Sequence, residues 1–218
     1  MNIFLTTIDK LSYLCPFLLL ITIFLSVRIK YKESVITDKI KIINYFLIGS
    51  LIIDLSSRLF AIYLDNNLLF INIYSLFEYI IIYCYLLTMK QYFAKWLTNI
   101  FYVILAYNLI EFIYIDFHDL KNFQSYAKAI NSIYLLIVVI SIVQEAIKLD
   151  ELNITDKLLT YLPVYLTISA VISLPVNLLV NLIDDTVYYI WSLHVINILI
   201  LYFVIFFTLW KYGKTQKI

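Results

Sequence analysis

Long apolar stretches recur along the chain, and short polar segments separate them. Each of the seven stretches has 17 to 26 residues, close to the ~20 residues that a helix needs to cross a bilayer. They cover 11–27, 42–64, 68–89, 96–115, 126–147, 158–183 and 186–210. Lipid offers no hydrogen-bond partners to the backbone, so each stretch is expected to be helical. The pattern predicts an all-α polytopic membrane protein, a single seven-transmembrane-helix bundle over residues 1–218.

Composition agrees with this pattern. Of the 218 residues, 63% are hydrophobic and 14% are charged, and the mean hydropathy is +0.91. Soluble globular domains have a smaller apolar share and a larger charged share. The lipid bilayer is therefore the expected partner. The basic residues are too diffuse to indicate nucleic-acid binding.

The orientation follows from the Lys and Arg residues near the ends of the spans. Three fall on one side of the predicted bundle, namely Lys10, Lys121 and Lys128. Twelve fall on the other side, namely Arg28, Lys30, Lys32, Lys39, Lys41, Lys90, Lys95, Lys148, Lys157, Lys211, Lys214 and Lys217. Since cytoplasmic flanks carry the excess of positive charge, we expect the N-terminus outside and the C-terminus in the cytoplasm.

Polar residues interrupt the apolar stretches, mainly in the predicted outer half. Asp54 and Arg58 lie one helical turn apart, and Glu78 lies near the centre of 68–89 with no opposite charge on its own helix. Ionisable groups at bilayer depth are costly and mark functional sites by default. At 1.5 Å per residue, Asp54 and Glu78 lie about 15 Å below the outer surface. The predicted ligand-binding set is Asp54, Arg58, Asn72, Tyr74, Glu78, Asn108, Glu111, Asn177, His194 and Asn197.

Helical spacing supports an inward polar face on each span. Asn72, Ser75 and Glu78 are three residues apart, a spacing that places side chains on one face of a helix. The layering predicts a polar cavity that is reached from outside and closed toward the cytoplasm. Arg58 has two alternative partners, Asp54 on its own helix or Glu78 on the next one. The span 158–183 contains Pro163 and Pro175 and is the expected site of a kink.

Motifs for known chemistry are not found in the sequence. It contains no HExxH, CxxC, GxSxG or glycine-rich phosphate loop, so neither catalytic residues nor metal ligands are assigned. A retinal Schiff base needs a Lys within the last span, and 186–210 has none. No cofactor is predicted, and catalysis is the less favoured interpretation.

Two segments carry a resemblance, NIYSLFEYIIIYCY at 72–85 and IWSLHVINILILYFVIF at 190–206. They resemble a group of small, uncharacterised seven-span membrane proteins of Bacteroidetes. The resemblance implies a multi-pass protein of a bacterial inner membrane but brings no mechanism. The positions that match the group are Asn72, Tyr74, Glu78, Tyr79, Trp191, His194 and Asn197.

Four functions compete at this point. The favoured one is a sensory or ligand-binding bundle for a small polar or amphiphilic molecule, with a membrane signalling partner or a second copy that relays the signal. A small-solute or proton-coupled transporter would use Glu78 as its titrating group but needs a polar route through the inner half. A lipid-modifying intramembrane enzyme would use Glu78 or Asp54 as base and His194 as acid. A structural membrane subunit would use the polar residues only for packing.

Overall fold

The computed structural model describes residues 10, 12–32, 38–64, 68–89, 95–113, 126–148, 157–179 and 186–215. Helices account for nearly all of these residues, and no strand occurs among them. The elements are α2 (Leu14–Lys32), α3 (Asp38–Leu64), α4 (Leu68–Leu87), α5 (Lys95–Glu111), α6 (Ala127–Lys148), α7 (Lys157–Leu179) and α8 (Thr186–Thr215). The all-α prediction is confirmed, and each described helix overlaps one predicted apolar stretch.

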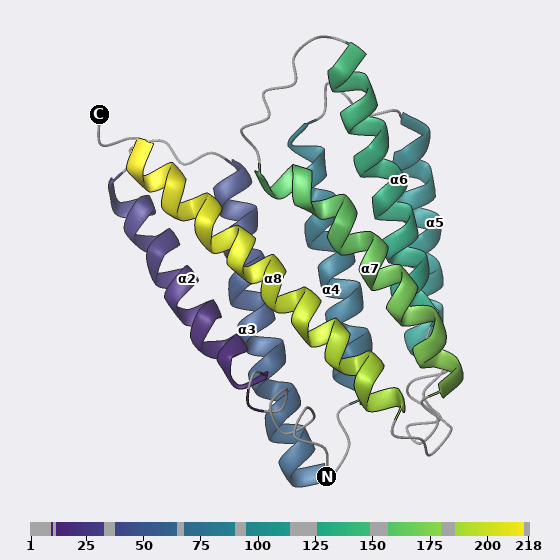
Figure 1. Ribbon diagram of the computed structural model, residues 1–218. Coiled ribbons are helices and arrows are strands. Elements are labelled where there is room, and N and C mark those ends of the chain that lie inside the picture. Colours follow the sequence, from purple (N-terminus) through teal and green to yellow (C-terminus); the bar gives the residue numbers. More distant parts are fainter. Residues whose placement is uncertain are drawn as a thin grey trace.

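Six of these helices form a closed ring. The neighbours in contact are α2 and α3, α3 and α4, α4 and α6, α6 and α7, α7 and α8, and α8 and α2. Helix α5 is not part of the ring but packs outside it against α6, at the edge of the bundle in Figure 1. The ring therefore has an interior that side chains of six helices can reach.

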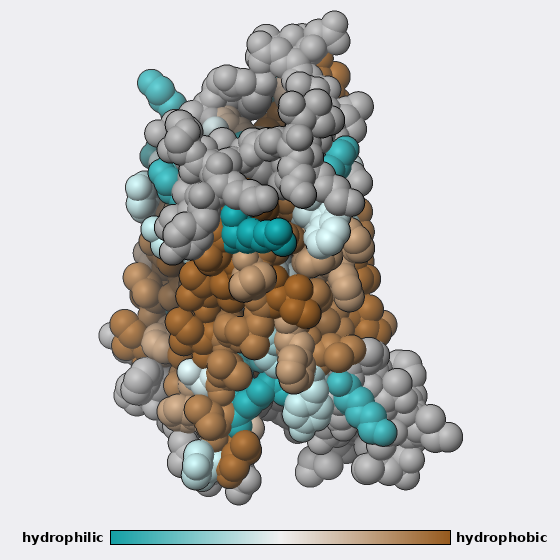
Figure 2. Space-filling model, turned by 90° about the vertical axis from the view of Figure 1, so that its left-hand side faces the viewer, coloured by the Kyte–Doolittle hydropathy of each residue, from teal (hydrophilic) through white to brown (hydrophobic). Residues whose placement is uncertain are grey.

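The outer surface of the bundle is apolar. Among the described residues, five helical segments are long and apolar enough to cross a membrane: Asp38–Tyr63, Leu69–Leu87, Ala127–Ile147, Leu158–Pro175 and Ser192–Lys211. Leu14–Ile29 is a shorter apolar helix. Figure 2 shows a broad hydrophobic band across the middle of one face, with hydrophilic residues above and below it. The protein is thus a multi-pass membrane bundle.

Helix α5 is held to the ring by tyrosines. The hydroxyl of Tyr79 on α4 donates to the Phe101 carbonyl at 3.1 Å, and that of Tyr134 on α6 donates to the Leu97 carbonyl at 2.6 Å. The rings of Tyr83 and Phe101 stack with centroids 3.7 Å apart. Buried tyrosine hydroxyls need partners, and the carbonyls of α5 provide them.

Gly49 allows α3 and α4 to approach closely. A Cβ atom at this position would lie 2.2 Å from Cζ of Phe77 on α4. The Phe77 ring is itself stacked on Phe46, with centroids 6.2 Å apart and 2° between the ring planes. Small residues commonly mark such contacts between transmembrane helices.

Helix α7 runs through both of its prolines, Pro163 and Pro175. The Thr167 hydroxyl bonds the Pro163 carbonyl at 2.8 Å, one turn along the helix. The kink expected from these prolines stays a prediction.

Candidate functional site

Glu78 lies halfway along α4 and points into the ring. Asn72, Ser75 and Glu78 share one face of α4, and all three are buried, as the spacing of three residues predicted. Side chains lean toward the N-terminal end of their helix, so the carboxylate is directed toward the half of the bundle in which α4, α6 and α8 begin. We call this half the polar half, and the opposite half the apolar half.

The Glu78 carboxylate is shared between two helices across the ring. One oxygen forms an ion pair with Nζ of Lys128 on α6, and the other accepts a hydrogen bond from the hydroxyl of Tyr165 on α7. The side chains of Lys128 and Glu78 are only 10% and 5% exposed, and Tyr165 is fully buried. The centre of the bundle therefore contains a desolvated pair of opposite charges.

Lys128 is the main residue that sequence reasoning missed. The sequence pattern places Lys128 among the flanking charges of the outer side. In the structure it is the second residue of α6 and is buried. A usable signal was its position three residues before Asn131, which places both side chains on the same face of α6.

Tyrosines surround the ion pair on its other sides. The Lys128 ammonium lies 5.4 Å from the centroid of the Tyr74 ring, within the range of a cation–π contact. The hydroxyl of Tyr74 is 3.3 Å from that of Tyr202 on α8. The ring of Tyr202 in turn contacts that of Phe46 on α3, with centroids 6.3 Å apart. Aromatic contacts thus link the pair to α8 and α3.

Two asparagines extend the network to α5. Asn108 and Asn131 bond each other through both amides, at 2.8 and 2.9 Å. Asn131 also donates to the Ser75 hydroxyl at 3.3 Å. Glu111, at the end of α5, accepts a hydrogen bond from the backbone N–H of Ala127 at 3.3 Å. This carboxylate lies at the N-terminus of α6, where the helix dipole favours negative charge.

Asn197 connects α8 to α7 beside the same centre. Its amide donates to the Tyr165 carbonyl at 3.1 Å and to the Ser169 hydroxyl at 3.2 Å. Its Oδ1 and that of Asn72 are buried without a hydrogen-bond partner among the residues that the structure describes. Such atoms are uncommon in protein interiors and are available to a bound polar molecule.

Asp54 and Arg58 form a separate pair. Nε of Arg58 lies 3.0 Å from Oδ2 of Asp54, with both side chains 28% exposed. The guanidinium also donates to the Ser12 carbonyl at 2.7 Å and lies 5.2 Å from the Tyr13 ring centroid. Of the two partners considered for Arg58, the structure shows Asp54. Glu78 pairs with Lys128 instead, which resolves the alternative that the sequence left open.

His194 is buried on α8. The side chains of Asn177 and of Trp191, a position that matches the resembling group, lie outside the described residues. Of the ten predicted ligand-binding residues, Tyr74, Glu78, Asn108 and Asn197 belong to the network around Lys128, whereas Asp54 and Arg58 do not.

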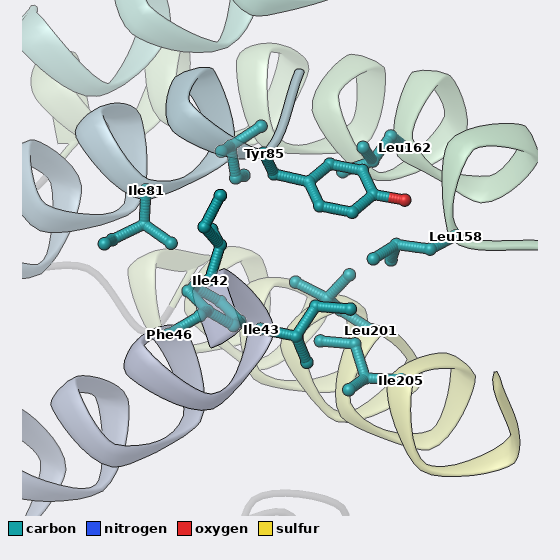
Figure 3. Close-up of a pocket in the computed structure, with 10 residues that line it drawn as sticks. Ile42, Ile43, Phe46, Ile81, Tyr85, Leu158, Leu162, Leu201 and Ile205 are labelled. Carbon is teal, nitrogen blue, oxygen red and sulfur yellow. The ribbon is translucent and has the colours of Figure 1, made fainter. Parts of the chain in front are cut away.

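An apolar cavity lies in the other half of the ring. It is small, with a cavity volume of about 30 Å³, and it is partly open to the surroundings. α3, α4, α7 and α8 line it, with Ile42, Ile43, Phe46, Tyr85, Leu162 and Leu201 around the space in Figure 3. The sequence predicted a polar cavity in the polar half, whereas this cavity lies in the apolar half. Around Glu78, direct side-chain contacts neutralise the buried charges.

Among the described residues, no group of three or more His, Cys, Asp and Glu side chains could hold a metal ion. The centre around Glu78 contains one ammonium, one carboxylate and several hydroxyls and amides held by five helices. Such an arrangement can bind charged or hydrogen-bonding groups. No protein-family model, no curated protein and no solved structure matches the chain.

Proposed function

We propose that this chain is a seven-span sensory or ligand-binding protein of a bacterial inner membrane, with its N-terminus outside and its C-terminus in the cytoplasm. Its binding centre is the ion pair between Lys128 and Glu78. The resemblance to small seven-span proteins of Bacteroidetes is part of this proposal. A membrane signalling partner or a second copy of the chain would relay the bound state.

The buried ion pair is the observation that supports the proposal. Two charges in a low-dielectric interior recover their desolvation cost poorly, and apolar residues of the same size often give a more stable protein. A purely structural centre has no need for them. Charges within a membrane are expected to face a site of function.

The pair suits a ligand that brings its own charges or hydrogen-bonding groups. Without ligand, Lys128 and Glu78 neutralise each other. A small polar or zwitterionic molecule would offer an anionic group to Lys128 and a donor to Glu78, while the free Oδ1 atoms of Asn72 and Asn197 would accept further hydrogen bonds. The exchange replaces one set of neutralising contacts by another, so no charge is left unpaired.

Binding is better supported than transport. A carrier needs a polar route across the whole bundle, and the described cavity in the apolar half is bounded by aliphatic and aromatic side chains. The apolar lining of one half and the polar side chains of the other favour a site that a polar molecule enters and leaves from one side.

The test is native mass spectrometry of the protein released gently from its own membranes. We expect a specific added mass on the wild type and on Asp54→Asn, which alters the separate pair. The folded Glu78→Gln variant should lack this mass. Equal spectra for all three proteins, or loss of the mass in Asp54→Asn alone, would contradict the proposal and favour a structural subunit.

A further inference from the structure

The six helices of the ring form two units with the same order and direction. The first unit is α2, α3 and α4 and the second is α6, α7 and α8, and the contacts between neighbours are unchanged when the two units are exchanged. Successive helices alternate in direction, so α2 runs parallel to α6, α3 to α7 and α4 to α8 (Figure 1). A twofold rotation about the axis of the ring therefore relates the arrangement of the two units. Helix α5, outside the ring, carries the chain back to the side at which α2 began.

The two units also share sequence patterns at buried positions. Residues 73–76 of α4 read IYSL and residues 190–193 of α8 read IWSL, and in both a tyrosine follows ten residues after the serine, as Tyr85 and Tyr202. In α3 and α7 the shared pattern is an aromatic residue, a leucine directly after it and a serine three residues later. It consists of Phe46, Leu47 and Ser50 in the first unit and of Tyr165, Leu166 and Ser169 in the second. The serines, tyrosines and these paired residues are buried, so the agreement concerns the packed interior.

The polar contacts of the centre join one unit to the other. Glu78 of the first unit contacts Lys128 and Tyr165 of the second. Two further contacts cross between the units in the same half of the bundle, those of Ser75 with Asn131 and of Tyr74 with Tyr202, each at 3.3 Å. In the apolar half, the small cavity lies between α3 and α4 of the first unit and α7 and α8 of the second. Polar bonds thus hold the units together in the polar half, and apolar packing holds them in the apolar half.

The two boundaries between the units differ in charge. One lies between α4 and α6, and the other between α8 and α2. When the IYSL and IWSL segments are aligned, Glu78 of α4 corresponds to Val195 of α8. In the same way Tyr165, which donates to Glu78, corresponds to Phe46, which has no hydroxyl. The fold of a unit therefore does not require these polar groups, since its counterpart forms without them.

We propose that the ion pair of Lys128 and Glu78 is a lock between two units that move as bodies, and that breaking the pair opens the polar half along the boundary of α4 and α6. A charge that loses its partner inside the bundle keeps its desolvation cost, and separation of the units would return it to water. Apolar contacts are non-directional, so the apolar half can serve as the pivot. In transporters built from such repeats, binding sites lie between the repeats near the bilayer midplane.

This lock deepens the proposed function and rests on it in one respect, because a bound ligand that takes over both charges would open the same boundary. Helix α5 lies along this boundary outside the ring and is bonded to both sides of it. Tyr79 of α4 and Tyr134 of α6 each donate to one of its carbonyls. Opening would therefore change the position of α5 relative to at least one unit, which gives a partner protein a surface that depends on the state of the lock.

The experiment measures distances between spin labels by pulsed electron–electron double resonance. It uses the full-length protein in lipid nanodiscs, in a background in which Cys15 and Cys84 are replaced by alanine. One pair of labels joins the two units, with Ile62→Cys on α3 and Leu174→Cys on α7. A control pair lies within the second unit, with Ile133→Cys on α6 and the same Leu174→Cys. The three labelled side chains are exposed and belong to the polar half.

Opening of the lock should change only the distance between the units. In Lys128→Met and in Glu78→Gln, we expect a second, longer distance between the labels on α3 and α7, with an increase beyond the roughly 1–2 Å of small helix shifts. The control distance should stay the same. The ratio of open to closed protein should rise by up to about a hundredfold, the factor that corresponds to the loss of one partner of a buried ion pair. Asp54→Asn alters a pair within the first unit and should change neither distance.

Tyr165→Phe provides a milder variant in case the charge variants do not fold. It removes one bond between the units, leaves both charges paired and introduces the residue that the first unit has at Phe46. The ratio of open to closed protein should then rise by about tenfold, as for one hydrogen bond to a charged group.

An unchanged distance between the units in the folded variants of Lys128, Glu78 and Tyr165 would overturn the lock. An equal lengthening of the control distance would do the same, because it would indicate a general loosening of the bundle, and so would an equal effect of Asp54→Asn. Native mass spectra test the ligand, whereas these distances test the lock without any ligand. Either proposal can therefore fail while the other holds.

Discussion

The ion pair between Lys128 and Glu78 should show strong coupling in a double-mutant cycle. Removing one partner of a buried ion pair costs about 3–5 kcal/mol, because the other charge stays buried and unpaired. Each single variant here keeps a partial partner. In Lys128→Met the carboxylate retains the Tyr165 hydroxyl, and in Glu78→Gln the ammonium retains the face of Tyr74 at 5.4 Å. We therefore expect each single loss near the lower end, about 3 kcal/mol.

The double variant should be far less destabilised than the sum of the two. The double variant removes both charges and leaves side chains of similar volume. In buried ion pairs of other proteins, such a change is often neutral or stabilises the fold by about 1–4 kcal/mol. The coupling energy should then be about 6 kcal/mol, the sum of the two single losses. This value exceeds that of surface pairs by a wide margin.

The assay is unfolding of the four proteins in mixed micelles by increasing SDS, followed by tryptophan fluorescence. A parallel cycle on the exposed pair of Asp38 and Lys41, 2.9 Å apart, should give a coupling within about 0.5 kcal/mol. Additive effects of Glu78→Gln and Lys128→Met, or a coupling no larger than that of the exposed pair, would refute the assignment of a desolvated ion pair.

Further predictions concern the contacts around this centre. Gly49→Ala should destabilise the bundle by about 1–3 kcal/mol, because the new Cβ would lie 2.2 Å from the Phe77 ring; a thermal-shift measurement that finds no loss would contradict this close approach. Asn108→Leu should cost about 1–3 kcal/mol, since it removes both hydrogen bonds between this residue and the partner amide of Asn131 on α6, and SDS unfolding tests it. Asp54→Asn should cost only about 1 kcal/mol because its pair with Arg58 is partly exposed; a larger loss would indicate a second role for this carboxylate.

Much of the fold was accessible from the sequence because bilayer thickness sets the length of each apolar stretch. The inward face of α4 was also accessible, since the spacing of Asn72, Ser75 and Glu78 admits only one shared face. These features depend on distances along one helix, which a sequence contains directly.

The arrangement of helices around the ring was not accessible. In lipid, no hydrophobic force selects which helices meet, and packing and hydrogen bonds decide instead. The exclusion of α5 from the ring depends on tyrosine hydroxyls that reach its carbonyls. Lys128 was missed for a related reason. A lysine at the start of an apolar stretch is usually an interfacial residue, and only the position of Glu78 across the ring turns it inward.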